Sequence, residues 1–287
     1  MERVLFIGGD KRMIYAAERL SQVTGVDTLG LGEKNLPTGR YDIIILPLPF
    51  SRNTGEINAP LCSEKLPLSL VSEYSVSGGI VFSGQSSPEL ETLCHEHELK
   101  LTDYFADESL TLKNAALTAE AAVSLLIQNT DSSLQGAEVL ITGGGRIALL
   151  LVPLLRAFGA EVTLCARNPV QRTRAMLSFS RAEPTDRLSE LCGTADIIIN
   201  TAPAQLFGEH EFSRMKRTEL FMELASLPAE PSKQFAEEQG IRYLHAAGLP
   251  GKISPKAAGY AIADTILSLI QPDDIRENIP PNNTSPV

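Results

Sequence analysis

Short apolar segments alternate with longer amphipathic segments along the chain. In the first half, apolar runs predict strands at residues 3–7, 26–29, 43–46, 79–83 and 100–102. Helical spacing of apolar residues predicts helices at 13–23 and 88–98. Strands separated by helices are typical of βαβ units, so this half is predicted to form a parallel sheet.

The pattern returns after a long Ala/Leu-rich helix predicted at residues 114–128. Further strands are predicted at 138–142, 161–165, 196–200, 220–223 and 242–244, and further helices at 146–158 and 255–270. The segment 248–251 between the last strand and helix is predicted to be a turn. The fold class expected is therefore α/β, with two Rossmann-like doubly wound parallel-sheet domains joined by long helices, as in 2-hydroxyacid and alanine dehydrogenases.

The same pattern gives the expected domain boundaries. Residues 1–112 together with 253–272 are expected to form the first domain, 113–135 a linking helix, and 136–252 the second domain. The tail at 273–287 is polar and proline-rich, so it is expected to be disordered.

Composition excludes several classes of protein. The 287 residues carry 25 Lys and Arg against 35 Asp and Glu, a net charge of −10, which argues against a general nucleic-acid binder. The 4 cysteines lie far apart, so neither a disulfide framework nor a metal site is indicated. The apolar runs are too short for a signal peptide or a membrane span. We expect a soluble, cytoplasmic protein.

A glycine-rich turn is the strongest chemical signal. Gly143, Gly145 and Ala148 form a G-x-G-x-x-A pattern that leaves a predicted strand and opens a predicted helix. Such glycines permit a tight turn and let the backbone approach a pyrophosphate, while the small third residue lets the helix pack closely. The N–H groups of the helix start, including those of Arg146 and Ile147, would face the phosphates. We predict a dinucleotide site here; a purely structural turn is the alternative.

The end of the next strand bears on cofactor choice. An NAD site usually places Asp or Glu there, whereas this chain has Ala166, Arg167 and Asn168. Arg167 would attract a 2′-phosphate, so NADP is favoured over NAD, with NAD as the alternative. Arg167 could also be a solvated surface residue, as could Arg172 and Arg174.

Loops after later strands are expected to complete the cofactor site, because ligands of doubly wound sheets lie beyond the carboxyl ends of the strands. The residues singled out are Thr201, Pro203, Ala225 and Gly248. His245 also lies at a strand end, where it could act as an acid or base, although structural histidines are common. No metal motif is present: His95 and His97 do not share a helix face.

In the first half, the segment Gly8–Arg12 follows a strand but lacks the full dinucleotide fingerprint. We expect Arg12 or Lys11 to bind a substrate carboxylate instead. Segments 47–52 and 83–86 follow other strands of the same predicted sheet, which adds Arg52 and Ser83 as substrate-binding residues.

The chain resembles the A-subunit family of dipicolinate synthase, found in spore-forming bacteria. The resemblance covers about residues 3–270, and its most distinctive motif is Gly248-Leu-Pro-Gly251 followed by Pro255-Lys256-x-x-Gly259. Other matching segments are Ile7-Gly-Gly-Asp10 with Arg12, Val81-Phe-Ser-Gly84, Thr118-Ala-Glu120, the glycine turn, Asn200-Thr201-x-Pro203 and Leu224-Ala-Ser226.

The resemblance implies oxidation of a dihydrodipicolinate-type intermediate to dipicolinate, with a nicotinamide cofactor and, as partner, the flavoprotein-like B subunit of dipicolinate synthase. From their positions in the chain, we expect Arg12, Arg52 and Lys256 to contact the carboxylates, and His245 or Glu120 to handle the proton. Oligomerisation is expected. The chain departs from the family pattern at Leu117, Ala121 and 227–229. The alternatives are another NAD(P)-dependent dehydrogenase and a non-catalytic cofactor-binding assembly subunit.

Overall fold

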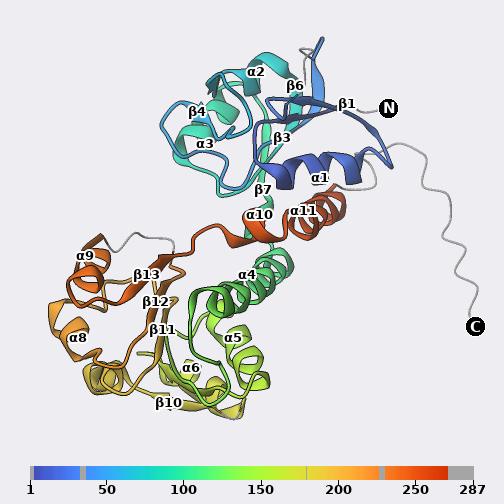
Figure 1. Cartoon of the computed structure of the whole chain (residues 1–287). Helices are drawn as coiled ribbons and strands as arrows, with labels where there is room; N and C mark the ends of the chain where they lie inside the picture. The colour runs from blue at the N-terminus through green and yellow to red at the C-terminus, as the bar shows by residue number, and fades with distance from the viewer. Residues whose placement is uncertain (1–2, 33–36, 179, 226–229, 271–287) are drawn as a thin grey trace, which may run out of the picture. The chain divides into compact units, whose positions relative to one another are not determined.

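The computed structural model describes residues 3–32, 37–178, 180–225 and 230–270. The chain divides into two compact units, drawn in Figure 1. Residues 1–114 with 254–287 form unit 1, and residues 115–253 form unit 2. The tail predicted at 273–287 lies outside the described residues.

Unit 1 is built on a five-stranded sheet in the order β2-β1-β3-β6-β7, with all strands parallel. Its strands are β1 (Arg3–Ile7), β2 (Gly25–Leu29), β3 (Tyr41–Ile45), β6 (Ser75–Ser83) and β7 (Lys100–Asp103). This order places a topological switch point between β1 and β3. A two-stranded antiparallel hairpin, β4 (Glu56–Ile57) with β5 (Leu66–Pro67), was not predicted, because two-residue strands leave no alternation to recognise.

Alternating side chains of β1 supply two hydrophobic cores, one on each face of this sheet. Val4 and Phe6 join the cluster of α1 (Lys11–Leu20) and α11 (Pro255–Leu269). Leu5 and Ile7 join the cluster of α2 (Leu70–Tyr74) and α3 (Pro88–Glu96). The 3-10 turn η1 (Tyr104–Ala106) follows β7 and belongs to the first of these clusters.

Helix α11 packs directly against α1, although the two are far apart in sequence (Figure 1). Gly259 makes this approach possible, because a Cβ there would lie 2.3 Å from the carbonyl oxygen of Arg12 and 2.8 Å from Cβ of Tyr15. The distinctive Pro255–Gly259 motif therefore has a packing role: it ties the last helix to the first.

Unit 2 contains a six-stranded parallel sheet in the order β10-β9-β8-β11-β12-β13. The strands are β8 (Glu138–Thr142), β9 (Glu161–Cys165), β10 (Arg181–Glu183), β11 (Ile197–Asn200), β12 (Leu220–Glu223) and β13 (Arg242–His245). In chain order this is 3-2-1-4-5-6, the doubly wound arrangement of dinucleotide-binding domains. The predicted fold class, two Rossmann-like parallel-sheet domains, is confirmed.

Helices cover both faces of this sheet. They are α5 (Arg146–Ala157), α6 (Pro169–Leu177), α7 (Leu188–Cys192), which follows η2 (Thr185–Arg187), α8 (Glu209–Arg214), α9 (Glu230–Glu238) and α10 (Leu249–Ile253). The turn predicted at 248–251 is wrong, because α10 begins there. Gly248 has a φ of +68° and ends the preceding segment, and Pro250 falls in the first turn of a helix, where its missing N–H costs little.

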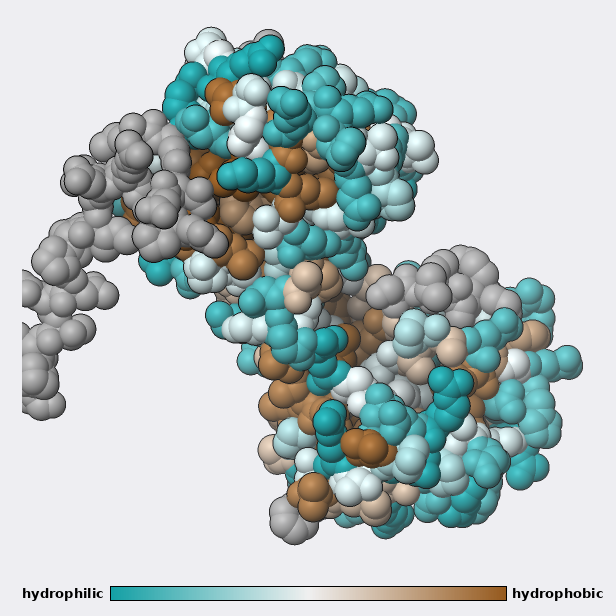
Figure 2. All heavy atoms as spheres, turned by 180° about the vertical axis from the view of Figure 1, so that it is seen from behind, coloured by the Kyte–Doolittle hydropathy of each residue, from teal (hydrophilic) through white to brown (hydrophobic). Residues whose placement is uncertain are grey.

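The predicted helix at 114–128 is longer than expected: α4 spans Glu108–Asn129. By length and composition it is the one described helix apolar enough to cross a membrane, but its apolar residues Ala119, Ala122 and Leu126 are buried in the core of unit 2. A core helix passes the same test. On the face shown in Figure 2, hydrophobic residues are exposed among hydrophilic ones on both units.

Replacing Gly259 by Ala is expected to destabilise unit 1. Alanine has the higher helix propensity by about 1 kcal/mol, but the added methyl group would meet backbone atoms of α1, and overpacking costs about 1–3 kcal/mol. Ala257→Leu, at an exposed position of the same helix, is the control and should change stability by less than about 0.5 kcal/mol. Urea unfolding measures both; a Gly259→Ala variant as stable as the parent would contradict this account.

Candidate functional site

The carboxyl ends of β8 and β11 form the switch point of the unit 2 sheet. The chain leaves β8 toward β9 on one side, and β11 pairs with β8 on the other side. In doubly wound sheets a dinucleotide binds across such a point. The loops that matter are therefore the glycine turn after β8 and the segment after β11.

The glycine turn has the shape that a phosphate group requires. Gly143 has a φ of +92°, and a Cβ there would lie 2.6 Å from Oγ1 of Thr201. Gly145 is exposed, and a Cβ built on it would meet no atom within 4 Å. Ala148 is fully buried beneath the turn. The backbone around Gly145 is thus open to a ligand, while its two neighbours in the motif are packed.

The start of α5 is also chemically suited to an anion. Among the described residues no side chain caps this helix, and its first turn holds no acidic residue. By contrast, a side chain caps each of three other helices: Asp10 at α1, Ser87 at α3 and Asn168 at α6. The backbone N–H groups at the start of α5, including those of Arg146 and Ile147, therefore have the arrangement that binds phosphate.

At the end of β9, Ala166 is buried and Arg167 is exposed. The side chain of Asn168 accepts a hydrogen bond from the N–H of Val170, at 2.8 Å, and so is used as the helix cap. The alternative that Arg172 is only a solvated surface residue is wrong. Its Nη1 donates to the carbonyl oxygens of Ala166 and Arg167, both at 2.8 Å, which holds this loop in place.

A buried polar network links the ends of three neighbouring strands, and sequence reasoning missed it. Thr142, Asn200 and Glu223 are each the last residue of a strand and are aligned in register. Thr142 Oγ1 donates to Asn200 Oδ1 at 2.6 Å, and Asn200 Nδ2 donates to both Glu223 oxygens, at 3.0 and 2.9 Å. The available signal was that each of these apolar strands ends on a single polar residue.

Burial raises the pKa of the Glu223 carboxyl, which is fully enclosed, although hydrogen bonds from Asn200 and from the N–H of Ala225 oppose the rise. Three other predicted residues of unit 2 end or follow strands of this sheet. Thr201 donates its hydroxyl to the Thr142 carbonyl at 2.8 Å, and Pro203 is exposed. His245 is exposed at the end of β13, in register with Glu223.

Three further predicted residues differ in their surroundings. Ala225 is buried, and its N–H bonds Glu223 at 2.9 Å. Gly248 is exposed at positive φ just before α10. Glu120 is exposed on α4.

In unit 1, Arg12 lies at the switch point between β1 and β3. Its guanidinium pairs with Asp10, with Nε–Oδ1 and Nη2–Oδ2 distances of 2.9 Å, and Nη2 also donates to the Leu48 carbonyl. The side chain is almost buried. Of the guanidinium nitrogens, only Nη1 has no acceptor among the described residues. If Arg12 binds a substrate carboxylate, it would therefore do so through Nη1.

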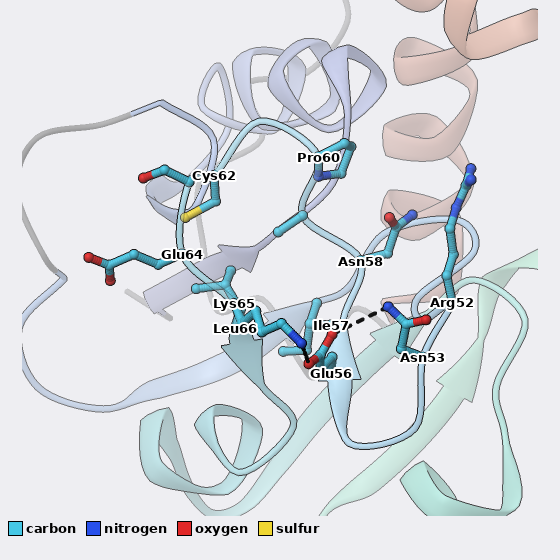
Figure 3. Close-up of a pocket in the computed structure, with 12 residues that line it drawn as sticks. Arg52, Asn53, Glu56, Ile57, Asn58, Pro60, Cys62, Glu64, Lys65 and Leu66 are labelled. Carbon is cyan, nitrogen blue, oxygen red and sulfur yellow. Dashed lines mark hydrogen bonds and ion pairs between the residues drawn. The ribbon is translucent and has the colours of Figure 1, made fainter.

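Arg52 lines an open cavity of about 260 Å³ beside the β4–β5 hairpin (Figure 3). Lys65 forms an ion pair with Glu56, and Asn53 donates to the same carboxylate at 3.3 Å. Asn58 also lines this cavity, and its Nδ2 donates to the Pro49 carbonyl at 3.1 Å. Sequence reasoning found Arg52 but not the polar residues around it, since the hairpin that gathers them was not foreseen.

The two other predicted residues of unit 1 have different environments. Ser83 is fully buried, and its hydroxyl is hydrogen-bonded to that of Ser86. Lys256 is exposed in the first turn of α11, with Nζ 5.5 Å from the centre of the Tyr260 ring. Lys256 is therefore accessible to a ligand, whereas the Ser83 hydroxyl is used internally.

Comparisons with known proteins agree with this division of the chain. Residues 3–105 match the family model of the N-terminal domain of the dipicolinate synthase A subunit. Residues 114–226 match the NAD binding domain of D-isomer specific 2-hydroxyacid dehydrogenases. The chain therefore contains an oxidoreductase-type domain for a nicotinamide cofactor.

Three matches that cover nearly the whole chain are to A subunits of dipicolinate synthase. The dipicolinate synthase A subunit of Bacillus subtilis is 29% identical over 283 residues, covering 93% of this chain and 95% of the relative. The crystal structure of this subunit from Bacillus halodurans has a TM-score of 0.82 at 25% identity, covering 93% of this chain and 97% of that one. The crystal structure of the same subunit from B. subtilis has a TM-score of 0.79 at 28% identity, covering 93% and 95%. Over 93% of its length the chain is therefore similar to A subunits of dipicolinate synthase.

Proposed function

We propose that this protein is a dipicolinate synthase A subunit that oxidises a dihydrodipicolinate-type intermediate to dipicolinate during spore formation. The observation that carries the proposal is the likeness to the B. subtilis protein over 93% of the chain. The proposal includes a nicotinamide cofactor, a partnership with a flavoprotein-like B subunit, a cytoplasmic location and an oligomeric state.

Residues of unit 2 are proposed to hold the cofactor. Gly143, Gly145, Arg146 and Ile147 form the open start of α5, where backbone N–H groups would bind the pyrophosphate. Ala166, Arg167 and Asn168 lie where the adenosine ribose would bind, and the Arg167 side chain favours NADP over NAD. Thr201, Pro203, Ala225 and Gly248 would surround the nicotinamide half.

The reaction removes a hydride from a ring carbon of the substrate and a proton, leaving an aromatic ring. The bound nicotinamide would supply the acceptor for the hydride. The remaining tasks fall to side chains of this chain. We propose that Arg12 (through Nη1), Arg52 and Lys256 bind the two carboxylates. Ser83 is proposed as a further substrate-binding residue, and His245 or Glu120 as the group that takes the proton. Binding and orientation of this kind can supply much of a rate enhancement.

The variant Gly145→Val is expected to abolish nucleotide binding without unfolding the protein. The new side chain would occupy the space that a pyrophosphate needs, and its Cβ would have no protein atom within 4 Å. Calorimetric titration with NADP measures binding, and thermal unfolding verifies the fold. Gly25→Val is the matched control, because Gly25 is an equally open glycine in unit 1. If Gly145→Val bound NADP like the parent, the glycine turn would have only a structural role.

The variant Arg167→Ala is expected to remove a preference for NADP. The unmodified protein should bind NADP at least tenfold more tightly than NAD, which is about 1.4 kcal/mol, and the variant should bind both alike. Arg174→Ala, which removes an exposed arginine from α6, should keep the preference. Equal affinities of the unmodified protein for NAD and NADP would contradict the predicted preference, and tighter binding of NAD would assign the chain to NAD.

Removing the proposed carboxylate contacts is expected to raise the substrate KM by tenfold or more. The variants are Arg52→Ala and Lys256→Ala, assayed for dipicolinate formation with and without the B subunit. Lys100→Ala is the control, because Lys100 is exposed at the start of β7, on the opposite edge of the sheet.

The same assay separates the alternatives. Unchanged KM values in both variants would contradict the assigned contacts. Nucleotide binding without turnover in any mixture would favour the non-catalytic assembly role. Turnover of a 2-hydroxy acid in place of the dihydrodipicolinate would favour another dehydrogenase, to which the match of residues 114–226 also points.

A further inference from the structure

We propose that Asn200 and Glu223 are positioning residues for the nicotinamide half of the cofactor. The inference rests on the proposed function. Through one buried hydrogen-bond network the two residues hold the backbone N–H groups of Ala202, just after β11, and Ala225, just after β12. Both positions follow strands on the nicotinamide side of the switch point.

The amide of Asn200 has a single orientation that satisfies its neighbours. Its Oδ1 accepts from the hydroxyl of Thr142 at 2.6 Å and from the N–H of Ala202 at 3.1 Å. Its Nδ2 donates to both oxygens of Glu223. A rotated amide would turn its NH₂ group toward the Ala202 N–H, and two donors cannot bond each other. The position of Ala202, in the loop after β11, is therefore coupled to Glu223.

Glu223 links the same network to the backbone that follows β12. Its Oε1 accepts from the N–H of Ala225 at 2.9 Å, two residues beyond the end of β12. Ala202 and Ala225 thus depend on the same pair of side chains. Because β11 and β12 are neighbours in register, the two loops start from adjacent points of one sheet edge.

A purely structural purpose does not account for the carboxylate. Glu223 is the only carboxylate that is buried among the residues the structure describes. Burying such a group is costly, and well-packed apolar residues often stabilise a fold as well or better. Just before the start of β12, by contrast, a buried polar side chain bonds the backbone alone: Thr218 donates to the Ala195 carbonyl at 2.9 Å. The network of Glu223 instead holds backbone groups that follow two neighbouring strands, at Ala202 and Ala225.

The test compares a complete cofactor with its adenosine fragment. The probes are ADP and the reduced nicotinamide dinucleotide that the unmodified protein binds more tightly, NADPH or NADH, followed by its fluorescence. Glu223→Gln replaces an acceptor oxygen by a donor facing Asn200 or Ala225. Thr142→Val removes only the hydroxyl that bonds Asn200. Thr218→Val makes the same chemical change before the start of β12, on the far edge of the sheet.

Glu223→Gln is expected to weaken binding of the reduced dinucleotide about tenfold and Thr142→Val by a smaller factor, while both bind ADP like the parent protein. Thr218→Val should change neither affinity. An unchanged dinucleotide affinity in Thr142→Val and Glu223→Gln would overturn the inference, as would an equal loss of ADP and dinucleotide binding. If the unmodified protein bound neither nucleotide, the proposed function would fail and this inference with it.

Discussion

Parallel alignment of the strands is the constraint on which both units depend. It brings the carboxyl end of every strand to one edge of its sheet, and register aligns the residues that end neighbouring strands. In unit 2 these last residues include Thr142, Asn200, Glu223 and His245, whereas the preceding residues of β8, β11 and β12 are mostly apolar and buried. The inner positions of these strands therefore form the core, and the last position of each strand belongs to the candidate site.

The two units use the first helix of this arrangement in opposite ways. Both α1 and α5 follow the first strand of a parallel sheet through a glycine-containing turn. In unit 1 the carboxylate of Asp10 caps the helix and pairs with Arg12, so a negative group already lies where an anion would bind. In unit 2 the N-cap residue of α5 is Gly145, which has no side chain that could cap the helix. Because the carboxylate of Asp10 already occupies the start of α1, α5 is the one of these two helices that is suited to phosphate.

Sequence patterns predicted the parallel strands well and the site only in part. Long apolar runs such as those of β8 and β9 were predicted with the bounds that the structure has, because burial on both faces leaves a clear signal. The strand β10 was missed since it has only 3 residues. The bond from Arg12 to the Leu48 carbonyl could not be foreseen because the two residues are 36 positions apart. The Asn200–Glu223 bond depends on strand register, which no local pattern contains.

The buried carboxylate of Glu223 also influences stability. Because burial raises its pKa in the folded protein, the folded state holds a proton over a pH range in which the unfolded chain has lost it. The unfolded state then binds fewer protons, so this group makes stability fall as pH rises from its ordinary pKa, about 4.3, toward its raised value. An isosteric amide would avoid that loss. A residue whose burial makes stability fall as pH rises, yet whose network holds the backbone at Ala202 and Ala225, is better explained by the site at this strand edge than by the fold.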